Sequence, residues 1–329
     1  MFEGIIKFIS WCIVLNIVQF TCQFFYKAFI MKKKDLKERY GKKSWVVVTG
    51  GSDGIGWEIV KQFAAEEFNI IMIARNMKKL VEKQELLKTL YSNVECEVMS
   101  YDLGKMTTAE QYQECVNSFS DKDVSVFVNN AGIMIGTIEA NEPAEILMVT
   151  NLNVMPCIMF TKYMTEKFYE REQRSAIVNF SSLLAGFPSR HNSVYCSTKA
   201  CVKQFTIGEA GNHGDKIDFL CIEPGMTSTS MMQNKSNWLV GSHPETVARE
   251  CLRGLGNVIC HAGDIRHLFP VELLIKFCRV IFPEFVCQSI MDNIQLFICG
   301  FQPGCKTLLD MPKVARTGMV AKLQEKMSG

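Results

Sequence analysis

From Ser44 onward, short apolar runs alternate with longer amphipathic stretches. The first run, "WVVVTG", is typical of a buried strand, and a helix is expected over residues 55–67. Five further runs follow, with helical stretches between them: "NIIMIA", "VECEVMSYDL", "VSVFVNNAG", "SAIVNFSS" and "KIDFLCIEPG". This alternation predicts an α/β fold with one doubly wound parallel sheet and helices on both of its faces. Sheets of this kind bind ligands at the carboxyl ends of their strands.

The N-terminal region has a different pattern. Residues 8–26 carry no charged side chain, and a run of this length is sufficient to cross the hydrocarbon core of a bilayer. A basic cluster follows, which predicts that the next domain lies on the cytoplasmic side of a membrane. Asn16, Gln19, Gln23 and Lys27 recur at helical spacing, so a helix that lies in the interface or packs against a partner remains an alternative. The basic cluster consists of Lys32, Lys33, Lys34, Lys37, Arg39, Lys42 and Lys43.

The alternation of strands and helices stops after about residue 262. Residues 267–301 are apolar and aromatic but are interrupted by charges. A membrane-surface hairpin, a cover over an apolar pocket and ordinary core helices are all compatible with this pattern. The sequence therefore predicts an anchor and basic linker over 1–43, an α/β domain over 44–262 and an apolar helical extension over 263–329.

Composition narrows the class of protein only modestly. Apolar residues make up 48% of the chain and charged residues 21%, which excludes a disordered chain. The formal net charge of +2 gives no reason to expect a nucleic acid as partner. The 14 cysteines include no C-x-x-C pair and no cluster at zinc-ligand spacing, so we expect buried free thiols and no metal site.

The stretch "TGGSDGIG", residues 49–56, follows the first predicted strand directly. Gly50, Gly54 and Gly56 lie where the strand must turn tightly into a helix. Glycine permits this turn and lets the backbone approach a pyrophosphate, which the N-terminus of the helix then stabilises. Between a strand and a helix, such a glycine triplet predicts a dinucleotide site.

Arg75 ends the second predicted strand, in "MIARN". An NAD site favours an acidic residue at this point, to bind the ribose hydroxyls, whereas a guanidinium suits the additional phosphate of NADP. We therefore expect NADP(H) as the cofactor, although Asp53 within the glycine turn adds no positive charge.

"TGGSDGIG", "NNAG", "NFSS", "YCSTK" and "EPGMTST" occur in the order and spacing of the short-chain dehydrogenase/reductase family. The chain resembles this family over about residues 44–262, which implies a Rossmann-type fold. "LKERYGKKSWVVVTGG", the N-terminal apolar segment and "ARNMKKL" are similar to one membrane-bound branch of it. That branch contains the 17β-hydroxysteroid dehydrogenases and the very-long-chain 3-oxoacyl-CoA reductases, and 3-ketodihydrosphingosine reductases are also similar.

The resemblance implies four catalytic residues. Tyr195 matches the general acid/base, Lys199 its partner, Ser182 the serine thirteen residues before the tyrosine, and Asn151 the asparagine that holds a water, with Asn153 as the competing assignment. We expect the Lys199 ammonium to lower the pKa of Tyr195, because a nearby positive charge stabilises the phenolate. The residues expected to bind the cofactor are Gly50, Ser52, Asp53, Gly54, Ile55, Gly56, Arg75, Asp102, Asn130, Tyr195, Lys199, Pro224, Gly225 and Thr227.

The expected function is that of a membrane-anchored, NADPH-dependent reductase of a lipid-like carbonyl. An apolar lid supports a lipid substrate, and it would contain Met231, Met232, Trp238 and Leu239. An acyl-CoA, a sphingoid base, a steroid and a retinoid all remain open. The alternative is a non-catalytic, nucleotide-binding subunit of a membrane assembly. A homodimer is usual in the family. The expected location is the endoplasmic reticulum with the domain facing the cytosol, or else the mitochondrial inner membrane.

Overall fold

The computed structural model describes residues 2–267 except 137, 139–140, 187–188, 190–191, 230 and 232–240. Over these residues the strands form one sheet in the order β3-β2-β1-β4-β5-β6-β7, and all of its pairings are parallel. The strand order reverses between β1 and β4, where sheets of this type bind ligands. The strands are β1 Trp45–Thr49, β2 Asn69–Ala74, β3 Cys96–Ser100, β4 Val124–Asn129, β5 Ser175–Phe180, β6 Ile217–Ile222 and β7 Cys260–His261.

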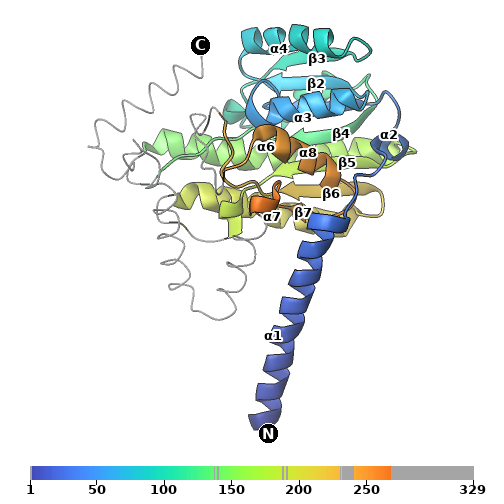
Figure 1. The fold of residues 1–329 in the computed structure, drawn as a ribbon. Coiled ribbons are helices and arrows are strands. Elements are labelled where there is room, and N and C mark those ends of the chain that lie inside the picture. Colours follow the sequence, from blue (N-terminus) through green and yellow to red (C-terminus); the bar gives the residue numbers. More distant parts are fainter. Residues whose placement is uncertain are drawn as a thin grey trace.

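Helices cover both faces of this sheet (Figure 1). Because side chains alternate along a strand, the continuous apolar runs supply both layers: Val46 and Val48 point into one core, Trp45 and Val47 into the other. The first core lies beneath α2 Leu36–Tyr40, α3 Gly54–Ala65, α4 Met77–Leu90 and α8 Pro244–Gly254. The second lies beneath α5 Ala109–Asn117, α6 Pro143–Glu170 and α7 Ser193–His213.

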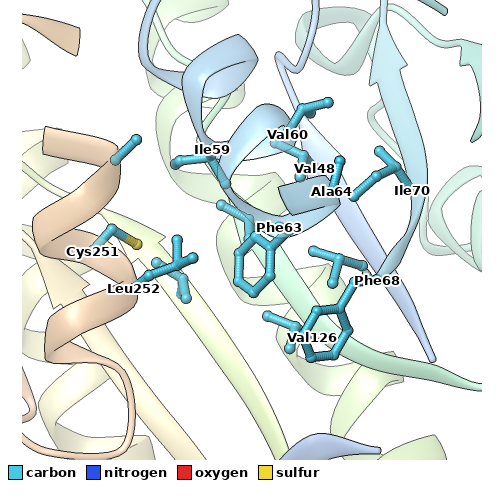
Figure 2. Close-up of a cluster of buried hydrophobic side chains, with 14 of the residues drawn as sticks. Val48, Ile59, Val60, Phe63, Ala64, Phe68, Ile70, Val126, Cys251 and Leu252 are labelled. Carbon is cyan, nitrogen blue, oxygen red and sulfur yellow. The ribbon is translucent and has the colours of Figure 1, made fainter. Parts of the chain in front are cut away.

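Helices α3 and α8 meet over the first core (Figure 2). Phe63 of α3 lies between Leu252 of α8 and Phe68, and its ring packs edge-on against Phe68 at a centroid distance of 5.6 Å. All three side chains are at most 1% exposed. Removing one such aromatic ring from water contributes roughly 1.5–3 kcal/mol to folding.

The N-terminal helix α1 Phe2–Phe25 extends away from the body of the domain (Figure 1). It continues into a π-helical turn, Tyr26–Ile30, whose end is attached to α8. Arg253 donates to the carbonyl oxygens of Lys27 (2.7 Å) and Met31 (3.3 Å), and Asn257 donates to that of Lys32 (2.8 Å). The apolar anchor therefore has a fixed point of attachment beside β7.

The basic segment after α1 is part of the domain rather than a free linker. Leu36 and Tyr40 of α2 are fully buried in the first core, and Arg39 forms a two-point ion pair with Asp218 of β6. The Tyr40 hydroxyl donates to the same carboxylate at 2.8 Å. The compact body thus begins before the predicted division at residue 43.

The predicted sheet with helices on both faces is confirmed, and each of the six predicted runs contains a strand. The seventh strand, β7, was not predicted. Two short helical turns, Leu103–Lys105 and Leu183–Gly186, and the short helix α9 Ile265–His267 complete the elements needed below. The predicted extension over 263–329 lies outside the described residues beyond His267.

Candidate active site

The glycine turn between β1 and α3 has the conformation that its sequence requires. Gly50 and Gly54 have φ angles of +66° and +52°, in the left-handed region that favours glycine. A Cβ on Gly56 would lie 2.3 Å from the carbonyl oxygen of Gly50 and 2.5 Å from Nδ2 of Asn130. Only glycine therefore fits at residue 56, where the helix starts against the turn.

Asn130 supports this turn from β4. Its side-chain amide donates to the carbonyl oxygens of Thr49 (3.0 Å) and Gly50 (3.3 Å), and its backbone N–H donates to the Thr49 hydroxyl (3.0 Å). Ser52 is buried within the turn and Ile55 is half-buried. Asn130, which was expected to bind the cofactor, thus holds the backbone of the turn in place.

The outer edge of the turn carries a charge pair. Asp53 caps α3 by accepting from the Gly54 N–H (2.7 Å), and its other oxygen lies 2.6 Å from Nζ of Lys79 on α4. Arg75, exposed at the end of β2, stands four residues before Lys79. Our sequence analysis missed Lys79, although the same "ARNMKKL" stretch contains it. A second cation besides Arg75 is therefore present in this region, and it contacts the turn directly.

Tyr195, Lys199 and Ser182 come together at the carboxyl end of β5. Tyr195 and Lys199 lie one turn apart on α7, and Ser182 follows β5. Ser182 lies close enough to Tyr195 to lower the pKa of its phenol, and the Ser182 hydroxyl donates to the Pro224 carbonyl at 3.5 Å. The Lys199 ammonium donates to the carbonyl oxygen of Phe180 at 2.7 Å. The side chains of Tyr195, Lys199 and Ser182 are at most 9% exposed.

The segment after β6 forms the opposite wall. Pro224 and Gly225 are half-buried, and a Cβ on Gly225 would approach both His267 and Leu183 to within 2.9 Å. The Gly225 N–H donates to Nδ1 of the buried His267 at 3.2 Å, and Thr227 Oγ1 donates to the Gly225 carbonyl at 3.1 Å. His267 is a second residue that our sequence analysis missed.

The remaining predicted residues lie at the margins of this site. Asp102 ends the β3 region and is 3.6 Å from the ammonium of Lys105. Met231 is exposed, whereas Met232, Trp238 and Leu239 of the predicted lid lie outside the described residues. The two ends of that segment are joined, since Ser228 N donates to Ser242 O (2.9 Å) and Ser242 N to Met226 O (2.8 Å).

Comparison with known proteins agrees with this arrangement. The sequence profile of short chain dehydrogenases matches residues 44–240. The chain belongs to the short-chain dehydrogenase family. It is therefore assigned to the oxidoreductases that act on hydroxyl or carbonyl groups.

Among the relatives of this short-chain dehydrogenase is a provisionally named steroid dehydrogenase 4 of Caenorhabditis elegans. It is 27% identical over 262 residues, which cover 78% of this chain and 97% of that protein. A very-long-chain 3-oxoacyl-CoA reductase of the same organism is 25% identical over 268 residues, 80% of this chain and 82% of that protein. A 7β-hydroxysteroid dehydrogenase structure superposes with a TM-score of 0.69 at 21% identity, covering 78% of this chain and 99% of that one. These relatives confirm the expected branch.

One electrostatic expectation is wrong for this structure of the dehydrogenase. Burial raises the pKa of Tyr195 to about 12, and the nearby Ser182 side chain only partly opposes this. Lys199 is not among the groups that lower the pKa of the phenol; its ammonium lies 5.8 Å from the centroid of the Tyr195 ring and donates to the Phe180 carbonyl at 2.7 Å. Burial also lowers the pKa of Lys199 itself, to about 8. Tyr195 is thus held as a neutral phenol near pH 7.

The asparagine on α6 that reaches this site is Asn153. Its Oδ1 accepts from Ile133 N (2.9 Å), and its Nδ2 donates to Ile133 O (2.9 Å) and to Thr198 Oγ1 (3.1 Å). Asn153 is buried, whereas Asn151, the preferred assignment from sequence, is only half-buried on the same helix. The structure therefore places the alternative residue, and not Asn151, beside the tyrosine and lysine.

The residues around the site fit a dinucleotide cofactor. A Cβ on Gly132 would lie 3.1 Å from Asn153 Oδ1 and 3.3 Å from Lys199 Nζ, so glycine leaves free space in front of both. This space lies just after β4, which pairs with β1 beside the glycine turn at the point where the strand order reverses. A cofactor held by the turn would extend toward Lys199 and Tyr195.

Proposed function

We propose that this protein is a membrane-anchored, NADPH-dependent reductase of a lipid-like carbonyl. The observation that carries the proposal is that Ser182 and Tyr195 lie together at the carboxyl end of β5, with Lys199 one turn further along α7. A catalytically inactive protein with this fold has no chemical need for these three side chains beside an intact glycine turn. Their arrangement favours catalysis over the alternative of a nucleotide-binding accessory subunit.

The bound cofactor would supply a hydride to the carbonyl carbon. Tyr195 then donates its phenolic proton to the carbonyl oxygen, on which negative charge develops. The phenol carries its proton near neutrality, as a donor must, and the raised pKa makes it a weaker acid than an exposed tyrosine. Ser182 donates a hydrogen bond to the same oxygen, which favours the build-up of charge there. Lys199 and Asn153 position the tyrosine and the cofactor, with Asn153 in the role that the sequence assigned first to Asn151.

Lys79 and Arg75 support the choice of NADPH over NADH. Both are cations near the end of β2, where a doubly wound fold binds the 2′ position of the ribose. Asp53 alone would repel a phosphate, but its ion pair with Lys79 offsets that charge. Two solved relatives are an L-sorbose reductase complexed with NADPH and a short chain dehydrogenase complexed with NADP, both 21–22% identical to this chain.

The membrane anchor supports a lipid-like substrate. Helix α1 presents large apolar side chains to its surroundings, including Phe8 and Trp11 at 70% and 66% exposure. An anchor of this kind holds the site beside membrane-dissolved molecules. Relatives named as steroid dehydrogenases and very-long-chain 3-oxoacyl-CoA reductases act on substrates of that class. We propose that the protein is anchored in the endoplasmic reticulum membrane and that the basic cluster keeps its catalytic domain on the cytosolic side.

Turnover of a 3-oxoacyl-CoA by the detergent-solubilised protein tests the reductase. Tyr195→Phe removes the proton donor and should lower turnover by about 10²–10⁴-fold without weakening NADPH binding. Tyr169→Phe, which removes a hydroxyl from an exposed tyrosine on α6, is the matched control and should retain full activity. NADPH binding without turnover of any lipid carbonyl would favour the accessory subunit. Failure to bind either nucleotide would contradict both functions.

A pair of neighbouring lysines tests the choice of cofactor. Lys79→Met should weaken NADPH binding by about tenfold and leave NADH binding unchanged, because only NADPH carries the additional phosphate. Lys78→Met, at an exposed neighbouring position, serves as the control. Equal loss of both nucleotides in Lys79→Met would instead indicate a damaged turn.

A further inference from the structure

Two thiols face each other where the last two strands of the sheet pair. Cys221 of β6 is the register partner of Cys260 of β7. Hydrogen bonds on either side hold this register: Cys221 N donates to Ile259 O (2.7 Å), and Glu223 N donates to His261 O (2.8 Å). Register partners on paired strands point to the same face of the sheet, so the two thiols are direct neighbours there.

The pair differs in exposure and in charge environment. Cys260 is half-buried, whereas Cys221 is completely buried. The neighbouring Cys221 thiol, together with the charges of Lys203 and Lys27, lowers the pKa of the Cys260 thiol, although burial and Glu223 oppose this. The Cys260 thiol and burial raise the pKa of Cys221. Since the thiolate is the reactive form, Cys260 is suited to react first and Cys221 second.

We propose that Cys221 and Cys260 form a peroxide-sensitive dithiol, which oxidises to a disulfide that joins β6 to β7. The Cys260 thiolate attacks one oxygen of hydrogen peroxide, so that an S–O bond forms, the O–O bond breaks and hydroxide leaves as water after protonation. Cys221 then attacks the sulfenic sulfur, so that an S–S bond forms, the S–O bond breaks and a second water leaves. The two thiols lose two electrons, and peroxide gains them. A dithiol reductant reverses the change.

Closing this bond requires movement at the edge of the sheet. Paired strands lie about 4.8 Å apart, whereas the Cβ atoms of a disulfide lie about 3.8 Å apart. β6 is paired on both sides, but β7 has only two residues and lies at the end of the sheet, so β7 is the strand that moves. A strained disulfide of this kind is easily reduced, as a reversible modification requires.

The dithiol is connected to the active site by two routes. Cys221 lies close enough to Lys199 to influence the pKa of that lysine. β7 leads through residues 262–266 to His267, which accepts the hydrogen bond of Gly225. Movement of β7 should therefore loosen the wall at Pro224 and Gly225. This consequence rests on the proposed function, whereas formation of the disulfide does not.

Peptide mapping of the full-length protein in detergent tests the bond directly. The protein is treated with a few equivalents of hydrogen peroxide, its free thiols are alkylated, and it is digested with trypsin. Cleavage after lysine and arginine yields residues 217–235 and 254–266, each with a single cysteine. We expect these two peptides to be linked, and the link to disappear on treatment with dithiothreitol. Cys260→Ser should abolish the link, and Cys201→Ser, at an exposed cysteine on α7, should leave it intact.

The outcomes separate the dithiol from its effect on the cofactor. Cys260 oxidised without a link, a link to another cysteine, or two thiols that stay reduced would each overturn the proposal. NADPH affinity, followed by fluorescence, should fall about fivefold on oxidation, which corresponds to the loss of one hydrogen bond, and should recover on reduction. Unchanged affinity despite a linked peptide would overturn the connection to the site. Absence of NADPH binding in the reduced protein would instead contradict the proposed function, and the linked peptide would still decide the dithiol.

Discussion

Two helices of this protein, α1 and α6, are long and apolar enough to cross a membrane, but they lie in opposite environments. In the most apolar 18 residues of each segment, 6% are buried within residues 10–30, which comprise α1 and the following turn, and 39% are buried within α6. Helix α1 extends away from the domain, and α6 packs against the sheet beside α5 and α7 (Figure 1). Length and apolar composition therefore do not reveal which of two helices faces lipid.

What distinguishes the two helices is the partner of each apolar side chain. Phe160 of α6 has no exposed surface and packs against Phe127 of β4 and Tyr112 of α5, at centroid distances of 5.0 Å and 5.3 Å. Trp11 of α1, by contrast, is 66% exposed. An apolar face that the described part of the chain leaves uncovered requires another apolar medium, and this need supports the proposed anchor.

The largest expected difference comes from placing a lysine in each helix. Met164→Lys puts a charge into the second core, where Met164 is fully buried, and should cost more than about 4 kcal/mol, enough to prevent folding. Val18→Lys in α1 should leave the unfolding temperature of the domain in detergent unchanged but weaken retention in liposomes. A comparable drop in unfolding temperature for Val18→Lys would show that α1 is part of the folded core.

Truncating large side chains gives the next largest effect. Phe160→Ala should lower the free energy of unfolding by about 3–5 kcal/mol, because it leaves a cavity between α5, α6 and β4. Leu147→Ala on the same helix is the control, since Leu147 is 64% exposed, and should change stability by less than about 0.5 kcal/mol. Urea or thermal unfolding of both variants checks this, and equal effects would contradict the burial seen for α6.

The sequence predicted the sheet because each run is apolar without interruption, as strands buried on both faces require. It did not predict β7, because two residues, Cys260 and His261, make no apolar run. The sequence alone also could not decide between Asn151 and Asn153. Residues two apart on a helix point in nearly opposite directions, and apolar neighbours on both sides hide which direction is inward. The contact of Lys199 with the Phe180 carbonyl depends on how α7 docks on β5, which no local pattern records.

Replacing either of the two asparagines on α6 should have a smaller effect on stability. Asn153→Ala removes both hydrogen bonds to Ile133 and the one to Thr198, and should cost about 1–3 kcal/mol because buried partners are left unpaired. Turnover should fall as well, since the lysine and tyrosine lose a neighbour. Asn151→Ala should leave both quantities nearly unchanged. If Asn151→Ala alone lowered turnover, the original assignment from sequence would be correct.

The smallest effect on stability is expected where the N-terminal anchor joins the folded domain. Arg253 holds the end of the anchor through the carbonyls of Lys27 and Met31, and it also pairs with Glu250 at 2.5 Å. Arg253→Gln should cost only about 1 kcal/mol in stability, because these groups are partly exposed to water. Amide hydrogen exchange should nevertheless increase at residues 27–32 and remain unchanged at α6. Arg249→Gln, one turn earlier on α8 and more exposed, should have neither effect. Faster exchange across the whole domain would mean that the anchor is coupled to the core, and the contrast between α1 and α6 would then be one of degree.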